Sequence, residues 1–183
     1  MSSLKQASRR AAQFLGVVAI AVSLGGCLRP LYGPTASGER LDAALAAIDV
    51  ATVTTAQQQQ RVSHYLRSEL IYELNGSGIE QPKRYRLTVA LSERLQTPIV
   101  DTETGRANSA TIIADATYTL TTADGSRIIA QGNATNSATY DRTIQRFATL
   151  RAARDAEIRL AKQIAEQIKM RIAVALRADP VAL

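Results

Sequence analysis

Two stretches in which apolar and polar residues alternate set the strongest limit on how this chain can fold. Lys83–Gln96 and Ser109–Thr122 both follow the two-residue period of a strand that buries one face. Asp124-Gly125 then marks a tight hairpin that leads into Arg127–Ala138. The middle of the chain is therefore predicted to form an antiparallel sheet, with Thr97–Asn108 as a connecting loop.

Alternation also assigns the strand residues to two faces. The predicted inward face is apolar and contains Tyr85, Leu87, Val89, Leu91, Ile112, Ala114, Ala116, Tyr118 and Leu120. The opposite face carries hydroxyl and basic side chains, namely Arg84, Arg86, Thr88, Ser92, Arg94, Thr111, Thr117 and Thr119. Threonine is a common strand residue, so this polar face is either an ordinary solvated surface or a contact surface for a partner.

Two further segments have the three- and four-residue spacing of amphipathic helices. The first, Gln57–Asn75, stops at a glycine, and the second runs from Asp141 to about Arg177, before Asp179-Pro180. Leu45–Thr55 is predicted to be a strand because its end is β-branched, although its alanine-rich start also suits a helix. The predicted apolar stripe of the long helix consists of Leu150, Leu160, Ile164, Ile168, Ile172 and Leu176.

These elements follow one another in the order β-α-β-β-β-α. Helices with one apolar stripe cover a sheet with one apolar face because each buries the other. We therefore expect an α+β fold, a two-layer sandwich in which two helices pack on one face of a four-stranded, mainly antiparallel sheet. Residues 41–178 are expected to form this domain, and residues 179–183 a tail.

The first residues of the chain follow the pattern of a secretion signal. Lys5, Arg9 and Arg10 precede the apolar run Ala11–Leu24, which is shorter than the roughly 20 residues that cross a bilayer as a helix. An uncleaved transmembrane anchor is therefore the weaker alternative. Removal of the signal lowers the formal net charge from +6 to about +3. Export argues against a nucleic-acid partner and favours anionic lipid or glycolipid as the partner of the basic excess.

Cys27 is the only cysteine, and it directly follows Leu24-Gly25-Gly26. This ending resembles the lipobox of bacterial lipoproteins. The resemblance implies that the thiol of Cys27 receives a diacylglyceryl group, that the chain is cut before it, and that the new amino group is acylated. Residues 1–26 would then be a signal peptide and 27–40 a lipidated tether; a buried structural cysteine is the alternative. By the same resemblance, Leu28 in place of aspartate directs the protein to the periplasmic face of the outer membrane.

The residues supply little chemistry for catalysis or metal binding. His64 is the only histidine, and a zinc site normally needs three or four histidine or cysteine ligands. A hydrolase triad and a phosphate-binding glycine loop also lack their signatures. On the last helix, charges of opposite sign recur at helical spacing, which is typical of a solvated face. We expect neither an enzyme nor a metal site.

Several motifs together resemble the LptE family of lipopolysaccharide-assembly lipoproteins. Cys27–Gly33 (CLRPLYG) is similar to the family's opening C-G-F-x-P-L-Y-G; Leu28-Arg29 replaces Gly-Phe-x, while Pro-Leu-Tyr-Gly is intact. The predicted order of elements also fits the family's sandwich. Further similar segments are Arg61–Leu70, Tyr85-Arg86-Leu87, Asp101–Arg106 (DTETGR) and Tyr140–Leu150.

The resemblance implies a role without catalysis. Such a lipoprotein lies inside a large outer-membrane β-barrel, the LptD-like lipopolysaccharide translocon, where it acts as a plug, helps the barrel fold and binds lipopolysaccharide. It implies no cofactor beyond the N-acyl and S-diacylglycerol groups on Cys27. One alternative is a structural or scaffolding lipoprotein that does not bind glycolipid. Another, a small periplasmic hydrolase, requires a catalytic pocket that the sequence does not display.

Basic residues on and beside the first alternating strand are the predicted lipopolysaccharide contacts. Arginine binds phosphate through two parallel hydrogen bonds, and lysine binds it as a point charge. The nearest acids in the sequence, Glu80 and Glu93, are too few to neutralise the group. The candidates are Lys83, Arg84, Arg86, Arg94 and, in the following loop, Arg106.

Overall fold

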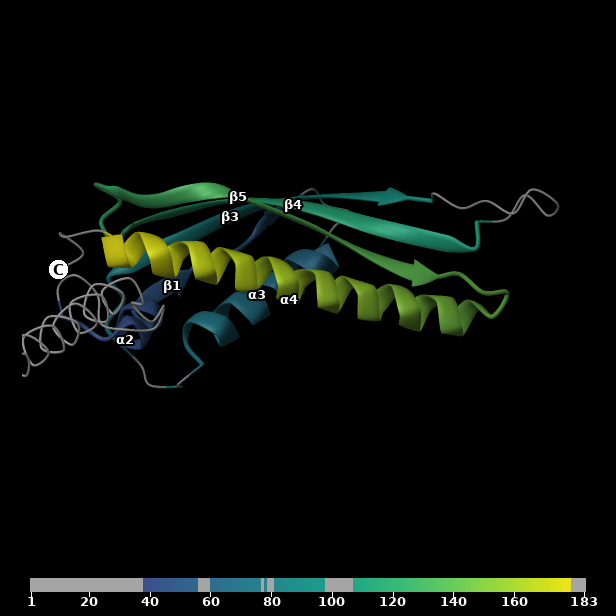
Figure 1. Ribbon diagram of the computed structural model, residues 1–183, viewed down its shortest axis with the longest axis horizontal. Coiled ribbons are helices and arrows are strands. Elements are labelled where there is room, and N and C mark those ends of the chain that lie inside the picture. Colours follow the sequence, from purple (N-terminus) through teal and green to yellow (C-terminus); the bar gives the residue numbers. More distant parts are fainter. Residues whose placement is uncertain (1–37, 56–59, 77, 79–80, 98–106, 179–183) are drawn as a thin grey trace, which may run out of the picture. The chain divides into compact units, whose positions relative to one another are not determined.

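The computed structural model describes residues 38–55, 60–76, 78, 81–97 and 107–178 (Figure 1). All of them belong to one compact unit, residues 34–183. The predicted signal peptide, the lipobox with Cys27, most of the tether, the tail and Arg106 lie outside the described residues. Among the described residues, no helix combines the length and the hydropathy that a membrane span requires.

Five strands and three helices make up the described fold (Figure 1). In chain order they are α2 (Leu41–Ala46), β1 (Ile48–Val50), β2 (Thr54–Thr55), α3 (Gln60–Leu74), β3 (Tyr85–Gln96), β4 (Ser109–Thr122), β5 (Ile128–Asp141) and α4 (Arg146–Ala178). The strand order is β1-β3-β4-β5, and the short β2 also pairs with β3. Because β3, β4 and β5 pair antiparallel along most of their length, the sheet is mainly antiparallel. The predicted α+β sandwich is confirmed.

The core lies between the sheet and the helices α3 and α4, which cover the same face (Figure 1). Every residue predicted for the inward face of β3 and β4 is buried, and Leu87 and Leu120 are completely so. Leu160, Ile164, Ile168, Ile172 and Leu176 of α4 belong to the same buried cluster. Each such side chain contributes about 1.5–3 kcal/mol by leaving water, which makes this layer the main source of stability.

Two ion pairs show how the helices lie against each other. Arg61 of α3 lies 2.7 Å from Glu157 of α4, and Glu73 of α3 lies 2.7 Å from Lys169 of α4. The pairs follow the same order along both helices, so α3 and α4 run parallel. The α3 hydroxyl of Tyr65 also accepts a hydrogen bond from Arg154, at 2.9 Å. The start of α3 is therefore level with residues 154–157 of α4.

Two predicted boundaries and the predicted burial of one residue need correction. Leu45–Thr55 is not one strand, because its alanine-rich start completes α2 and the remainder divides into β1 and β2. The last helix begins at Arg146 rather than Asp141, because β5 continues its pairing with β4 as far as Asp141. Leu150, predicted for the buried stripe, is 53% exposed. Leu150 precedes the residues of α4 that face the start of α3, so α3 does not cover it.

The hairpin between β4 and β5 lies where the sequence predicts it. Gly125 has a φ of 73°, a left-handed conformation that glycine adopts without steric cost. The Asp124 carboxylate accepts hydrogen bonds from the backbone N–H and the hydroxyl of Ser126. Hydrogen bonds from Thr122 and Ser126 lower the pKa of Asp124 to about 2. The aspartate therefore stabilises the turn as an anion.

Candidate functional site

The residues predicted to bind lipopolysaccharide are not gathered on one surface. Lys83 lies on the helix side of the sheet, where its ammonium group donates hydrogen bonds to the carbonyls of Ala46 and Ile48 at 2.8 and 3.2 Å. Alternation places Arg86 and Arg94 on the opposite face, where both are exposed. Where Arg106 lies relative to them falls outside the described residues.

Each of the three predicted arginines that the structure describes has an acidic partner within the chain. Arg84 lies 2.5 Å from Glu39, Arg86 lies 3.7 Å from Asp49, and Arg94 lies 2.6 Å from Asp115. A hydrogen bond from the Thr135 hydroxyl, together with the Arg94 guanidinium, lowers the pKa of Asp115, which is therefore an anion at neutral pH. The expectation that these arginines lack acids to neutralise them is wrong, because folding brings the acids from other segments.

The remainder of this sheet face is built from short polar side chains, as predicted. Thr88 and Thr117 are exposed, and β5 extends the same face with further hydroxyls. Some of these groups bind each other: the hydroxyls of Thr111 and Thr139 are 2.8 Å apart. The face is therefore a polar surface with local hydrogen bonds. Its use as a contact surface stays a prediction.

A second group of arginines lies where β5 passes into α4, and sequence reasoning did not identify it. Hydrogen bonds hold the connection in place. The backbone N–H of Arg142 donates to the Asn108 carbonyl at 2.9 Å. The Thr149 hydroxyl accepts from the Thr143 N–H at 3.0 Å and donates to the Thr143 carbonyl at 3.1 Å. These hydrogen bonds hold the end of β5 to Asn108 and the connecting segment to the first turn of α4. We call residues Arg142–Arg151 the β5–α4 junction.

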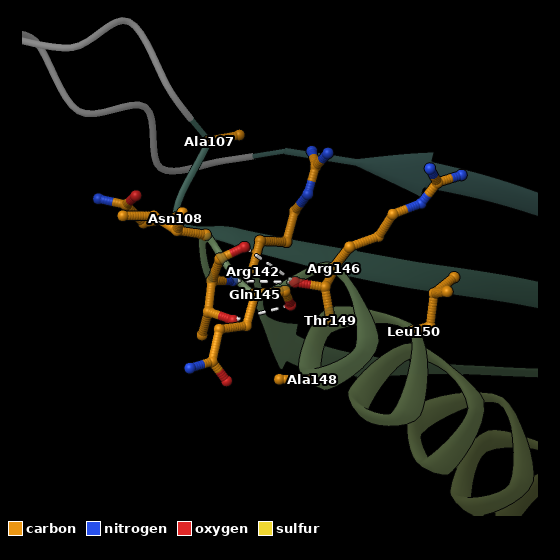
Figure 2. A pocket seen from close by; sticks show the side chains of 10 residues that line it. Ala107, Asn108, Arg142, Gln145, Arg146, Ala148, Thr149 and Leu150 are labelled. Carbon is orange, nitrogen blue, oxygen red and sulfur yellow. Dashed lines mark hydrogen bonds between the residues drawn. The ribbon is translucent and has the colours of Figure 1, made fainter.

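An open hollow of about 1090 Å³ lies against this junction (Figure 2). The side chains of Arg142 and Arg146 extend to the same side of it, as Figure 2 shows. Ile144 and Leu150 also line the hollow and are 90% and 53% exposed, and Phe147 of the same segment is 84% exposed. Monomeric proteins seldom leave several large apolar side chains of one short segment in water, so their exposure indicates a binding surface.

The junction differs from the sheet face in its electrostatics. Within the described residues, none of Arg142, Arg146 and Arg151 takes part in an ion pair. The first turn of α4 also contains no acid, although acidic side chains are favourable at a helix N-terminus. The helix therefore begins with positive charge that nothing described in the chain offsets.

A sequence signal for this site existed. In the segment RTIQRFATLR, Ile144, Phe147 and Leu150 recur every three residues, and arginines recur among them. We assigned Leu150 to the core stripe and treated the basic residues as a solvated face. The error arises because a helical period does not reveal where the neighbouring helix begins.

The chemistry of the junction suits an amphipathic anion. Guanidinium groups bind phosphate or carboxylate oxygens with charge-assisted hydrogen bonds, and the apolar side chains can contact hydrocarbon. Among the described residues, no group of three or more histidine, cysteine, aspartate or glutamate side chains gathers that could hold a metal ion. His64 is exposed on α3 beside the ring of Tyr65.

Comparison with known proteins finds a matching family model and similar solved structures. The family model described as "LptE: Lipopolysaccharide-assembly" matches residues 45–172, which is most of the chain. The chain is similar in structure to a candidate lipoprotein from Caulobacter crescentus CB15, with a TM-score of 0.60 and 23% identity over 76% of this chain and 97% of that one. It is also similar to a minor lipoprotein from Acinetobacter baumannii, with a TM-score of 0.49 and 14% identity over 69% of this chain and 90% of that one. No curated protein sequence matches the chain.

Proposed function

Because this chain belongs to the LptE family of lipopolysaccharide-assembly proteins, we propose that it binds lipopolysaccharide at the β5–α4 junction. The observation that carries the proposal is the pairing of arginines with exposed apolar side chains on one short segment. Lipopolysaccharide presents phosphates beside acyl chains, so it matches both halves of the junction. A charge-assisted hydrogen bond contributes about 1.5–3 kcal/mol before screening, and a buried apolar side chain a similar amount.

The predicted contacts Arg84, Arg86 and Arg94 remain part of the proposal in a smaller role. Each must exchange an internal carboxylate for a phosphate, so the net gain is the difference between two similar interactions. Lys83 is further restricted, because it holds carbonyls on the helix side of the sheet. The arginines of the junction make no such exchange with any described residue.

The remaining parts of the proposal concern location and partner. We propose that Cys27 carries the lipid anchor and that the protein is held at the periplasmic face of the outer membrane. The polar face of the sheet suits contact with the polar interior of a large LptD-like β-barrel, which this protein would plug and help to assemble. This role needs no catalysis and no cofactor apart from the acyl groups on Cys27. Incorporation of labelled palmitate, and its loss in Cys27→Ser, tests the anchor.

The decisive binding experiment varies the ligand. The full-length chain in mild detergent is titrated with intact lipopolysaccharide, with dephosphorylated lipopolysaccharide and with deacylated lipopolysaccharide. We expect tight binding to the first and weak binding to the other two, because each modified form engages half of the junction. Equal binding to all three would contradict the proposal.

A second candidate function is a scaffold that binds the barrel but no glycolipid. The polar sheet face favours it, because that surface is broad and its arginines are already neutralised by acids. Purification from solubilised outer membranes separates the two functions. A stoichiometric barrel protein without any affinity for lipopolysaccharide would support the scaffold.

A further inference from the structure

Among the described strands, the sheet ends at β1 and the short β2 on one side and at β5 on the other, and basic side chains cover backbone carbonyls of β1 and of β5. A free edge presents unpaired N–H and C=O groups, to which the strand of another molecule can add. The two edges differ in size, since β1 has three residues and β5 has fourteen. The long edge is the greater hazard.

At the β1 edge, the backbone shows which carbonyls point outward. Ala47 and Ala51 form hydrogen bonds towards β3, so the carbonyls of Ile48 and Val50 face the free side. Lys83 donates to the Ile48 carbonyl at 3.2 Å, and Arg67 donates to the Val50 carbonyl at 3.5 Å. Both acceptors on this short edge are thus covered.

At the β5 edge, the covering side chains come from α4. Arg159 donates to the Thr139 carbonyl at 3.3 Å, and Arg171 donates to the Asn133 carbonyl. Positions 133 and 139 have the same parity along β5, so both carbonyls point to the same side of the strand. Twelve helical residues span about 18 Å and six strand residues about 20 Å, so the two spacings match. Both arginines are exposed and take their positions from α4.

We propose that Arg159 and Arg171 keep the β5 edge closed to strand addition, and that the strand they exclude is β5 of a second copy of this chain. Antiparallel pairing of two β5 strands would bring four guanidinium groups to one shared edge. Both arginines therefore oppose it by occupying the carbonyls that a new strand needs. Arg171 also opposes it by repelling its counterpart, whereas Asp155, 2.8 Å from Arg159, offsets much of the charge of that arginine. Both effects disappear when the side chains are shortened.

The test compares oligomeric states. Full-length wild-type protein and Arg159→Ala with Arg171→Ala are examined in mild detergent by sedimentation over a range of concentrations. We expect wild type to stay monomeric and the variant to dimerise, with self-association strengthened roughly tenfold for each contact removed. Hydrogen exchange gives the specific readout, because outward-facing amides of β5 become protected only if two strands pair.

Two further variants separate the edge from general charge. Arg159→Lys with Arg171→Lys keeps a donor and the charge, so it should stay monomeric. Arg154→Ala with Lys162→Ala removes the same charge from the same helix away from the β5 carbonyls, and it should also stay monomeric. A folded double alanine variant that remains monomeric at every concentration overturns the proposal, as does a control pair that dimerises equally.

If the double alanine variant does not fold, Arg159→Ala alone is measured in the same way. The proposal then requires a smaller but measurable dimer fraction with protected β5 amides. A folded single variant that is as monomeric as wild type overturns it.

Discussion

The arginines of the β5–α4 junction and those beside β3 carry the same charge in different surroundings. Arg84, Arg86 and Arg94 each have a carboxylate from another segment within 3.7 Å. The junction arginines have no such partner among the residues that the structure describes, and they stand among exposed apolar side chains. One group is therefore largely occupied within the fold, and the other is available to a ligand.

The difference shows that strand pairing decides which arginine side chains remain available to a ligand. Asp49 is the register partner of Arg86 in the β1–β3 ladder, so pairing itself brings the acid to the arginine. Asp115 lies on β4 opposite Ser92, one diagonal step from Arg94. The junction follows the end of β5, where no neighbouring strand supplies an acid from the described part of the chain.

The largest expected effect tests whether the junction really lies outside the core. Ile164 and Leu150 share the predicted stripe of α4, but Ile164 is fully buried and Leu150 is half exposed. Ile164→Asp should abolish folding, because an unpaired buried carboxylate costs several kcal/mol against a total stability of about 5–15 kcal/mol. Leu150→Asp should change stability by no more than about 0.5 kcal/mol.

Thermal unfolding followed by circular dichroism measures both variants. Equal destabilisation by Ile164→Asp and Leu150→Asp would mean that the junction is packed, and the comparison with the sheet face would then fail. A melting temperature for Ile164→Asp equal to that of wild type would show that the α4 stripe is not the core.

Much of the fold was predictable because it depends on local periods. The two-residue period of β3 and β4 holds wherever the strands pack, so Tyr85 and Leu120 were placed correctly. The exposure of Leu150 was not predictable, because it depends on the level at which α3 begins. The start of α4 was misplaced for a similar reason, since pairing with β4 extends β5 to Asp141.

The candidate site was predicted less well than the fold. The sequence shows the basic residues near β3 but not Glu39, Asp49 and Asp115, which reach them only through folding. The junction was missed because exposed and buried apolar residues look alike at helical spacing. Basic residues near a sequence motif are thus a weaker indication of a binding site than basic residues that lack an acidic partner among the described residues of the folded chain.

The second prediction removes the charge of the junction. Arg142→Ala, Arg146→Ala and Arg151→Ala together should weaken binding to intact lipopolysaccharide roughly a hundredfold at low salt. The loss should shrink as salt rises, because screening also weakens the wild-type contacts. A titration at two ionic strengths measures it, and an unchanged circular dichroism spectrum shows that the fold is intact. Unaltered binding at low salt would remove the junction as the site.

The third prediction removes the same number of charges from the sheet. Arg84→Ala, Arg86→Ala and Arg94→Ala should weaken lipopolysaccharide binding only about threefold, because these side chains exchange one anion for another. The same variant should lower stability slightly, since ion pairs at or near the surface contribute up to about 1 kcal/mol each. If this triple variant loses more affinity than the junction variant, the assignment of roles is reversed.

The smallest expected effect comes from removing the acidic partner of one arginine of the sheet face, so that it resembles the junction arginines. Asp115→Asn removes the carboxylate that holds Arg94 but keeps a side chain of the same size. Freed from its partner, Arg94 should strengthen lipopolysaccharide binding about twofold at neutral pH. In wild type, hydrogen bonding from Thr135 and the charge of Arg94 lower the pKa of Asp115. A lowered pKa means that the stabilising effect of Asp115 is present above its unfolded-state pKa and is lost as pH falls through the folded-state pKa. Asp115→Asn should therefore lack part of the loss of stability that wild type shows in acid, which denaturant unfolding at several pH values measures. Binding that does not increase would mean that Arg94 is directed away from the ligand whether or not it is paired.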